Sequence, residues 1–248
     1  MSGNDWVYGV HAVESLLKHH PDSVLQLYVL HSRSDERLKA VLAGAAQRGI
    51  PVAQLSRAEL DAKTGGVHQG LAALCRELKL EKSEGFLKQL LDGLEHPPFL
   101  LVLDGVTDPH NLGACLRSAD AAGVDAVIVP KDKSALMTAT ARKVACGAAE
   151  VVPFIAVTNL VRCLEALKQR GIWVQGAAGE AGQSIYETDL TGPLAIVLGS
   201  EGEGMRRLTR ETCDETARLP IKVTALVDSL NVSNAAAVAL HALTRPRR

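Results

Sequence analysis

The sequence FLLVLDGVTDPHNLGACLRSADAAG, residues 99–123, contains one complete strand-to-helix unit. The unbroken apolar run at residues 99–103 is typical of a strand that is buried on both faces of a parallel sheet. Asp108 and Pro109 form an N-cap and first-turn pair, which predicts a helix that ends at Gly123. A buried strand followed directly by a helix is the repeating unit of an α/β fold.

Four further apolar runs follow this unit. They cover residues 126–129, 151–157, 172–174 and 194–198. Thr158 can cap an amphipathic helix that Gly171 ends. Because such runs are typical of strands covered on both faces, we expect a mostly parallel sheet with helices on its faces over residues 99–248.

The front of the chain has a smaller alternating pattern. Helical spacing covers residues 9–19 and 35–47, and strand patterns cover residues 24–30, 51–55 and 71–74. A polar stretch then begins at Leu78 and closes at Pro98, with helical spacing at residues 86–94. The expected organisation is a compact α/β domain at 1–77, a linker at 78–98 and the larger domain at 99–248.

Composition places the chain among soluble globular proteins. Of the 248 residues, 47% are apolar and 22% are charged, which excludes extended disorder and collagen-like repeats. No apolar run reaches the ~18 to 20 residues that a membrane span needs. The first residues, MSGND, lack the basic and apolar regions of a signal peptide. We therefore expect a cytoplasmic protein without membrane contact.

The cysteines and the charges exclude several kinds of site. The five cysteines, Cys75, Cys115, Cys146, Cys163 and Cys213, are scattered and include no CxxC pair, which favours reduced thiols over disulfides or zinc, so no metal is expected. The net charge is −1, so nucleic acid would have to bind through local basic patches. Aromatic residues are only 3%, which argues against a single-strand binder built on aromatic platforms. The local basic clusters are Arg33, Arg37, Lys39, Arg48, Arg57, Arg206-Arg207 and residues 245–248.

The segment 104–120 is the first candidate for a ligand site. It leaves the carboxyl end of a predicted strand and opens a helix, where open α/β sheets bind ligands and backbone N–H groups attract anions. Asn111 and Arg117 are polar residues on an otherwise small and apolar helix. The structural alternative is that Asn111 satisfies the turn and Arg117 lies on a solvated face.

The segment LGSEGEGM, residues 198–205, is the second candidate, again after a strand. Its three glycines in six residues allow the backbone to approach a ligand closely, but their spacing is not GxGxxG. Glu201 and Glu203 would repel a phosphate, so the loop suits a ligand with positive charge. The alternative is a flexible turn with solvated acids.

The segment LPIKVTALVDSLNVSN, residues 219–234, is the third candidate and precedes a helix of small and apolar residues at 235–243. Ser229 or Asn231 can cap that helix, so a structural role explains either residue. It does not explain Ser229, Asn231, Ser233 and Asn234 together. A helix so rich in alanine packs closely against the sheet or against a partner subunit.

In this order and at these separations, the three segments resemble the motifs of the SpoU (TrmH) family of RNA ribose 2′-O-methyltransferases in the SPOUT superfamily. At the front of the chain, YGVHAV at residues 8–13 and VHQG at residues 67–70 resemble the substrate-binding domain of the two-domain members. Within the family, the likeness is strongest to the members that methylate a guanosine in 23S rRNA.

The resemblance implies a parallel sheet with a C-terminal trefoil knot, preceded by a small domain similar to ribosomal protein L30e that binds RNA. The knot would hold S-adenosylmethionine in a bent form, and the alanine-rich helix would belong to a homodimer interface across which the active site is completed. The residues expected to bind the cofactor are Leu198, Gly199, Glu201, Gly202, Leu219, Pro220, Ile221, Leu230 and Asn231.

The resemblance also implies the reaction. A guanosine 2′-hydroxyl, in the P loop of the peptidyl-transferase centre, would attack the methyl carbon in line during maturation of the large-subunit rRNA. Arg117 would clamp the adjoining phosphate and polarise the hydroxyl, because a guanidinium with a pKa above ~12 rarely loses its proton. The residues expected to act in catalysis are Arg117, Asn111, Glu201, Ser229 and Asn231.

The third segment departs from the family pattern at two places. Residues 222–228 contain no glycine and form a loop about two residues longer than usual, and Asn234 stands where an apolar residue is commoner.

Three other functions stay open. The alternatives are methylation of tRNA ribose, a catalytically silent rRNA-binding protein, and a nucleotide-dependent oxidoreductase. The intact Asn111 and Arg117 argue against a silent protein, and the missing glycine fingerprint argues against an oxidoreductase.

Overall fold

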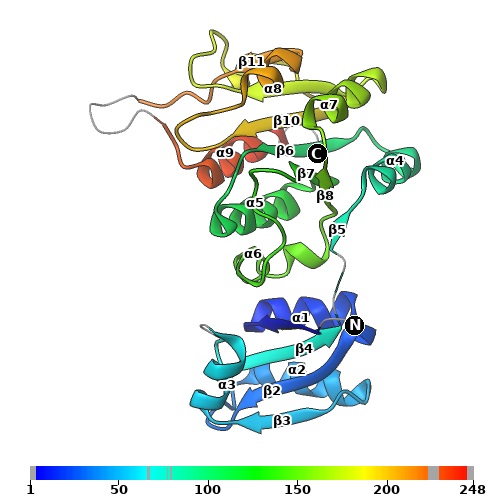
Figure 1. Ribbon diagram of the computed structural model, residues 1–248, viewed down its shortest axis with the longest axis vertical. Helices are drawn as coiled ribbons and strands as arrows, with labels where there is room; N and C mark the ends of the chain where they lie inside the picture. The colour runs from blue at the N-terminus through cyan, green and yellow to red at the C-terminus, as the bar shows by residue number, and fades with distance from the viewer. Residues whose placement is uncertain (1–3, 66–67, 77, 79, 223–228, 245–248) are drawn as a thin grey trace.

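The computed structural model describes residues 4–65, 68–76, 78, 80–222 and 229–244. They form two α/β units, one above the other, each built on its own sheet (Figure 1). The first unit is smaller and contains the N-terminus. The second contains all three candidate segments.

The first unit has a four-stranded sheet in the order β1-β4-β2-β3. β4 is antiparallel to both of its neighbours, and β2 is parallel to β3. The strands are β1 (Asn4–Tyr8), β2 (Val24–Leu30), β3 (Val52–Leu55) and β4 (Leu71–Arg76), and the helices are α1 (Val10–His19), η1 (Pro21–Ser23), α2 (Glu36–Gln47) and α3 (Arg57–Thr64). Apolar residues of α1 and α2 pack on one face of this sheet, so its core lies on that side.

The second unit has a seven-stranded sheet in the order β11-β9-β10-β6-β7-β8-β5. Every neighbouring pair is parallel, as the apolar runs predict. The strands are β5 (Glu81–Lys82), β6 (Phe99–Asp104), β7 (Ala126–Pro130), β8 (Phe154–Val157), β9 (Trp173–Ala177), β10 (Leu194–Gly199) and β11 (Glu215–Ala217). The helices are α4 (Glu84–Gly93), α5 (Pro109–Ala122), α6 (Ala139–Ala145), η2 (Ala148–Glu150), α7 (Leu160–Gln169), η3 (Ile185–Glu187), α8 (Arg207–Thr212) and α9 (Val232–Thr244).

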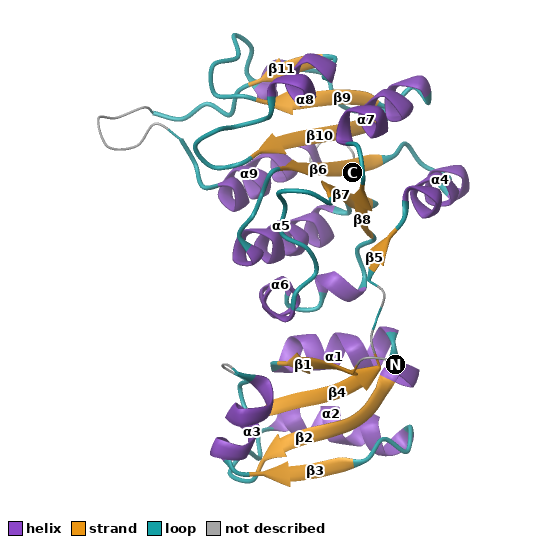
Figure 2. Cartoon of the chain, in the orientation of Figure 1, coloured by secondary structure: helices purple, strands orange, loops and turns teal. Residues whose placement is uncertain are grey.

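Both faces of the large sheet are covered by helices (Figure 2). One hydrophobic core joins the sheet to α5 and α9, and a second joins the opposite face to α4 and α7. The central strand β6 is buried along its whole length, which explains its unbroken apolar sequence. Gly113 lets α5 approach α6, because a Cβ at this position would lie 2.5 Å from the Ala141 carbonyl oxygen.

Part of the segment expected as a linker adds structure to the large sheet. β5 pairs with the edge strand β8, and Leu87 and Leu91 of α4 are buried in the second core. The helical spacing at residues 86–94 corresponds to α4. The division of the chain at 1–77, 78–98 and 99–248 stays a prediction, and the pairing of β5 joins residues 81–82 to the second sheet.

The two units contact each other through α6 and η2. The Ser15 hydroxyl on α1 donates a hydrogen bond of 2.9 Å to the Gly147 carbonyl oxygen. In the same contact region, Arg142 of α6 and Glu150 of η2 form a buried ion pair at 3.0 Å. Asp5 of β1 lies 3.9 Å from the Arg142 guanidinium. Burial raises the pKa of the Glu150 carboxyl, while Arg142 partly offsets this effect.

The described residues bear on membrane-spanning helices, metal ligands and disulfides. No helix among them is long and apolar enough to cross a membrane. No group of three or more histidine, cysteine or acidic side chains within the described ranges could hold a metal ion. The five cysteines are free thiols, and burial raises the pKa of Cys115 and of Cys163 to about 12.

Candidate active site

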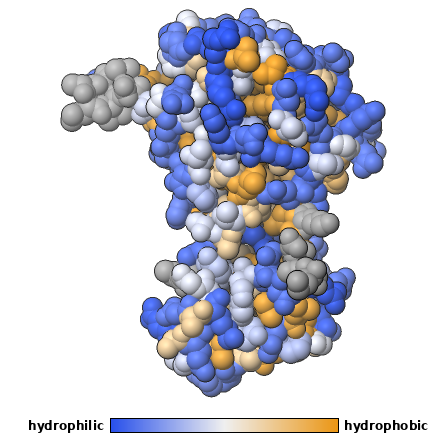
Figure 3. Space-filling model, viewed as in Figure 1, coloured by the Kyte–Doolittle hydropathy of each residue, from blue (hydrophilic) through white to orange (hydrophobic). Residues whose placement is uncertain are grey.

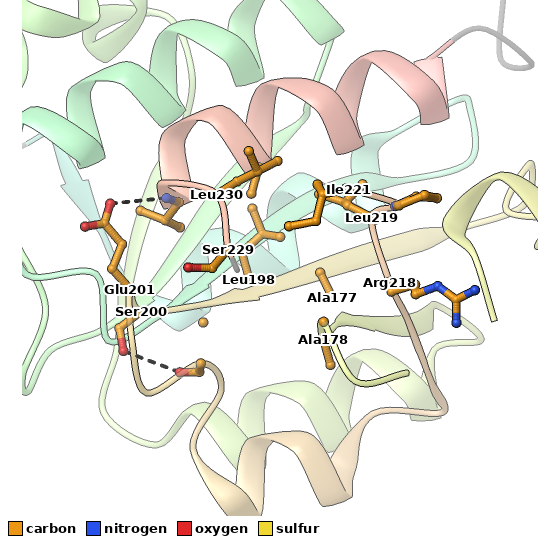
Figure 4. Close-up of a pocket in the computed structure, with 16 residues that line it drawn as sticks. Ala177, Ala178, Leu198, Ser200, Glu201, Arg218, Leu219, Ile221, Ser229 and Leu230 are labelled. Atoms are coloured by element: carbon orange, nitrogen blue, oxygen red, sulfur yellow. Dashed lines mark hydrogen bonds between the residues drawn. The ribbon is translucent and has the colours of Figure 1, made fainter. Parts of the chain in front are cut away.

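A cavity of ≈ 500 Å³ lies at the carboxyl ends of three adjacent strands of the large sheet. Ala177, Gly199 and Asp104 end β9, β10 and β6, and the first two strands supply residues of its wall. Polar loops that follow parallel strands meet at this edge, which is where open α/β sheets bind ligands. The lining residues are Ala177, Ala178, Gly179, Leu198, Gly199, Ser200, Glu201, Gly204, Arg218, Leu219, Pro220, Ile221, Ser229, Leu230, Val232 and Ala235 (Figure 4).

The glycine-rich second segment folds into a tight loop at one side of the cavity. The backbone N–H groups of Ser200 and Gly204 each donate to the carbonyl of the other, at 3.1 and 3.0 Å. Gly199 permits this closure, because a Cβ on it would lie 2.0 Å from the Gly204 carbonyl carbon. Gly202 and Gly204 have positive φ angles of 84° and 68°, which glycine adopts without strain.

Asp104 fixes the far end of this loop. Its side chain is buried, and its carboxylate accepts a hydrogen bond of 2.9 Å from the Arg206 backbone N–H. The Arg206 guanidinium also lies 2.9 Å from the same carboxylate. The loop between Gly199 and Arg206 is therefore held at both ends.

The three candidate segments meet in one hydrogen-bond network beside the cavity. Glu201 Oε1 accepts bonds from Asn111 Nδ2 at 3.0 Å and from the Val232 backbone N–H at 3.2 Å. Asn231 Nδ2 donates to Asn111 Oδ1 at 3.2 Å. Asn231 Oδ1 in turn accepts from the Ser233 N–H at 2.9 Å. A carboxylate and two amides, far apart in the sequence, are thus brought to one place.

The third segment forms the opposite wall. Figure 4 shows Leu219 and Ile221 on one side of the cavity, with Ser229 and Leu230 next to them at the start of α9. Glu201 lies at one end of the cavity, and the Arg218 guanidinium is turned away from it at the other. The unusual loop at 222–228 lies, apart from Lys222, outside the described residues.

Most of the residues expected to bind a cofactor line the cavity. They are Leu198, Gly199, Glu201, Leu219, Pro220, Ile221 and Leu230, and Ser229, expected to act in catalysis, joins them. Gly202 and Asn231 do not line it within the described part of the chain; Gly202 lies in the loop and Asn231 in the network.

Arg117 stands apart from this cluster. Its side chain is exposed on α5, and its Nη1 contacts the Cys146 thiol at 3.7 Å. It is absent from the described residues that line the cavity. Among the described residues, Arg117 is thus neither part of the cavity lining nor hydrogen-bonded to Glu201.

Sequence reasoning missed one wall of the cavity. Ala177 ends β9, and Ala178 and Gly179 follow it. The apolar run at 172–174 indicates this strand, so the position after it was a usable signal. Arg218 gave no such signal. Its Nη1 donates to the Ala181 and Gly182 carbonyl oxygens at 3.0 and 2.7 Å, which ties this loop to the third segment.

The cavity suits a mainly apolar ligand with polar edges. Leucine, isoleucine and alanine side chains supply apolar walls, while glycine loops expose backbone N–H and carbonyl groups. Glu201 is the acidic side chain among the described lining residues, so positive charge is favoured at its end. An anionic ligand of the phosphate kind is disfavoured there.

Comparison with known proteins matches each of the two units to a family model of RNA methyltransferases. The model of the SpoU rRNA Methylase family matches residues 98–241, and the model for RNA 2′-O ribose methyltransferase substrate binding matches residues 6–81. The chain is 57% identical to the 23S rRNA (guanosine-2′-O-)-methyltransferase RlmB of Pseudomonas putida, over 100% of this chain and 99% of that protein. It is 58% identical to the RlmB of Pseudomonas aeruginosa, over 100% and 98%.

Solved structures agree with the fold. A crystal structure of an RNA 2′-O ribose methyltransferase has a TM-score of 0.80 at 28% identity and covers 98% of this chain and 89% of that one. The SpoU methyltransferase AviRb from Streptomyces viridochromogenes, in complex with AdoMet, has a TM-score of 0.79 at 20% identity, with 99% and 91% covered. The family model matches more than half of the chain, and the full-length relatives exceed half identity, so this protein belongs to the SpoU rRNA methylase family.

Proposed function

We propose that this protein transfers a methyl group from S-adenosylmethionine to the ribose 2′-hydroxyl of a guanosine in 23S rRNA. The observation that carries the proposal is the network of Asn111, Glu201 and Asn231 beside a cavity formed by the same three segments. The names of the Pseudomonas relatives support the choice of 23S rRNA and guanosine. We place the target in the P loop of the peptidyl-transferase centre and the reaction in large-subunit maturation.

The cavity fits S-adenosylmethionine in size and chemistry. A volume of ≈ 500 Å³ lies within the ~300 to 1,000 Å³ that ligand pockets usually have. Leu198, Leu219 and Ile221 offer apolar contact to an adenine ring, and the loop at Gly199 offers backbone hydrogen bonds. When bound, the cofactor supplies an electrophilic methyl group on a cationic sulfur, and Glu201 lies where that charge would be favoured.

Each polar group of the network would have a distinct task. Asn111 and the Val232 N–H donate to the Glu201 carboxylate and orient it, and Asn231 holds the Asn111 amide by donating to its Oδ1. Ser229 completes the cavity wall beside Leu230. The 2′-hydroxyl oxygen would attack the methyl carbon in line as the carbon–sulfur bond breaks, so that S-adenosylhomocysteine leaves and the hydroxyl proton passes to solvent. Placement of the oxygen and the methyl carbon at near-attack distance would supply most of the acceleration.

Arg117 would act on the RNA across a homodimer interface. It is exposed on α5, away from the cavity of its own chain, and α5 packs against the alanine-rich α9. The outward residues Ala237 and Val238 of α9 are exposed, which suits a close contact with a second copy. In that dimer each guanidinium clamps the phosphate next to the ribose held in the partner protomer's cavity.

The remaining expectations belong to the same proposal. The segment from β11 to α9 would pass through a loop of the chain to make a C-terminal trefoil knot, with the cavity walls contributed by the knotted strands. Residues 1–77 would be an L30e-like domain that binds RNA, 78–98 would join it to the catalytic part, and 99–248 would hold the chemistry. The protein would work in the cytoplasm, where its rRNA substrate is assembled.

The experiment compares 2′-O-methylation of total RNA in cells with and without the gene. We expect one guanosine of 23S rRNA to lose its 2′-O-methyl group in the deletion strain and to regain it with the wild-type gene. An Asn231→Ala gene should restore it poorly, because the amide that orients Asn111 is lost. Loss of a tRNA ribose methyl group with 23S rRNA unchanged would contradict the proposal.

A further inference from the structure

The three aromatic residues among the first 80 positions lie on one face of the small sheet. They are Trp6, Tyr8 and Tyr28. Tyr8 and Tyr28 both pair with Ala72, one from each side, so they flank it in a single row across the sheet. Trp6 is two residues from Tyr8 on β1 and therefore points to the same face. We call this face, with the lysines described below, the open sheet face.

The opposite face of this sheet is the one that faces the core. Val7, Leu27 and Val29, which alternate with the aromatic residues, are buried with α1 and α2. Figure 2 shows these two helices behind the four strands, with the other face toward the viewer and α3 at one end. Trp6, Tyr8 and Tyr28 are each half-buried, so part of every ring remains accessible.

Lysine side chains lie over all three rings. Lys63 Nζ is 5.9 Å from the centre of the Trp6 ring and 5.6 Å from that of Tyr28, and the two rings are 5.1 Å apart. Lys143 Nζ, on α6 of the second unit, is 5.4 Å from the Tyr8 ring. Neither lysine has a carboxylate within ion-pair distance among the residues that the structure describes. Their charges are therefore available to an anion.

Five basic residues of the first unit, those that the sequence offers as phosphate contacts, already have partners. Arg33 and Asp35, Arg37 and Glu14, Lys39 and Glu36, and Arg57 and Asp61 form ion pairs, and Arg48 donates to the Gly44 carbonyl. These are the charges that the sequence offers as phosphate contacts. Among the described residues, Lys63 and Lys143 remain without an ion pair, as do Arg76 on β4 and Lys18 on α1.

The strand residues of the open sheet face carry no negative charge. The strand residues that share this face by alternation are Asn4, Trp6, Tyr8, Gln26, Tyr28, Leu30, Ala53, Leu55, Ala72, Leu74 and Arg76. They are neutral or basic. Figure 3, from the same side, shows a mixed surface on this unit rather than one continuous apolar patch. Rings interleaved with positive charge complement a polyanion that also carries flat bases.

The open sheet face also leads toward Arg117. Lys143 lies on the last turn of α6, and Cys146, which ends that helix, contacts the Arg117 guanidinium at 3.7 Å. Tyr8, Lys143, Cys146 and Arg117 therefore form a continuous path from the first unit to the second. A chain that runs along the rings arrives at the arginine expected to clamp the phosphate.

We propose that the open sheet face binds a single-stranded segment of the RNA substrate. Lys63 and Lys143 would turn from the rings to the phosphates, and bases would stack on Trp6, Tyr8 and Tyr28 in their place. This inference rests on the proposed function for its substrate and goes beyond it in naming the surface and the form of RNA. The low aromatic content of the chain does not oppose it, because the few rings of the first unit are gathered on one face. Stacking on aromatic side chains and release of counterions are the two forces that hold single strands.

The test uses full-length protein and a fluorescein-labelled single-stranded RNA of the target sequence. Tyr28→Leu and Trp6→Leu should each weaken binding about tenfold, whereas Tyr28→Phe should bind like the wild type because the ring is kept. Lys63→Ala should lower the log–log salt slope by ~0.7. Tyr186→Ala and Phe86→Leu are matched controls, since Tyr186 is 61% exposed and Phe86 lies 5.7 Å from Lys82 Nζ, both in the second unit. They should leave RNA affinity unchanged.

Three readouts separate this inference from the proposed function. Cofactor affinity and the thermal midpoint show that each variant is folded, and methylation of rRNA by the wild type tests the proposed function itself. Folded Tyr28→Leu and Trp6→Leu proteins that bind the single strand as tightly as the controls would overturn the inference while the wild type still methylates. A loss confined to duplex RNA would overturn it too, since stacking needs unpaired bases.

Discussion

Replacement of Gly199 by alanine tests whether the glycine loop shapes the cavity. The added Cβ would lie 2.0 Å from the Gly204 carbonyl carbon and 2.1 Å from the Met205 nitrogen. Carbon atoms in contact are ~3.5 to 4.0 Å apart, so the loop must move by about 1.5 Å. Both neighbours are backbone atoms, and no side-chain rotation can relieve the clash.

The movement would break identifiable contacts. The two Ser200–Gly204 backbone bonds and the two bonds to Glu201 Oε1 all depend on the position of this loop. At about 1 kcal/mol of net free energy for each bond, loss of two to four of them amounts to ~2 to 4 kcal/mol. Because the same loop lines the cavity, we expect the dissociation constant for S-adenosylmethionine to rise at least thirtyfold.

Calorimetric titration of the Gly199→Ala protein with the cofactor measures the change in the dissociation constant. A denaturation curve of the same protein measures the loss of unfolding free energy. Gly182→Ala is the matched control, because its Cβ would meet nothing within 4 Å and its φ is not positive. It should bind like the wild type. A Gly199→Ala protein with unchanged affinity and stability would refute the reasoning.

Three further substitutions probe other parts of the structure. Arg117→Ala should lower methyl transfer at least a hundredfold in a steady-state assay with cofactor affinity within twofold of the wild type; equal loss of affinity would place this arginine in the cofactor cavity. Gly113→Ala should cost ~1 to 3 kcal/mol of unfolding free energy, because its Cβ would lie 2.5 Å from the Ala141 carbonyl oxygen, while Gly93→Ala should be neutral in the same urea titration. Burial raises the pKa of Glu150 above its ordinary 4.5, so the folded state binds this proton more tightly and the contribution of Glu150 to stability falls as pH rises from 4.5 through its folded pKa. Glu150→Gln should remove that fall, and an unchanged pH profile would show that the carboxyl is not desolvated.

The sequence predicts the centre of the second unit well and its edges poorly. β6 and β10 are buried on both faces, so their composition alone identifies them as parallel strands. β5 and β11 are short and carry polar residues, and only pairing with β8 and β9 makes them strands. Residues 81–93 therefore look like part of a linker, although β5 pairs with the large sheet and α4 packs against it.

For the site, the sequence indicates which residues are candidates but not which of them contact one another. Asn111, Glu201 and Asn231 could be selected because each is a polar residue after an apolar element, but no local pattern indicates that they bond to one another. The wall after β9 and the role of Arg218 depend on which strands are neighbours. The sequence likewise shows how many aromatic residues the first unit has, but only the register of the strands places them on one face of the sheet.

The most direct test of the central claim identifies the methylated atom. Purified full-length protein is incubated with methyl-labelled S-adenosylmethionine and 23S rRNA from a strain that lacks the gene, and the digested nucleosides are separated and analysed by mass spectrometry. The proposed chemistry predicts about one label per rRNA, all of it as 2′-O-methylguanosine, and an at least hundredfold slower transfer with the Arg117→Ala protein. Label on a base, or no transfer by a protein that binds the cofactor, would contradict it.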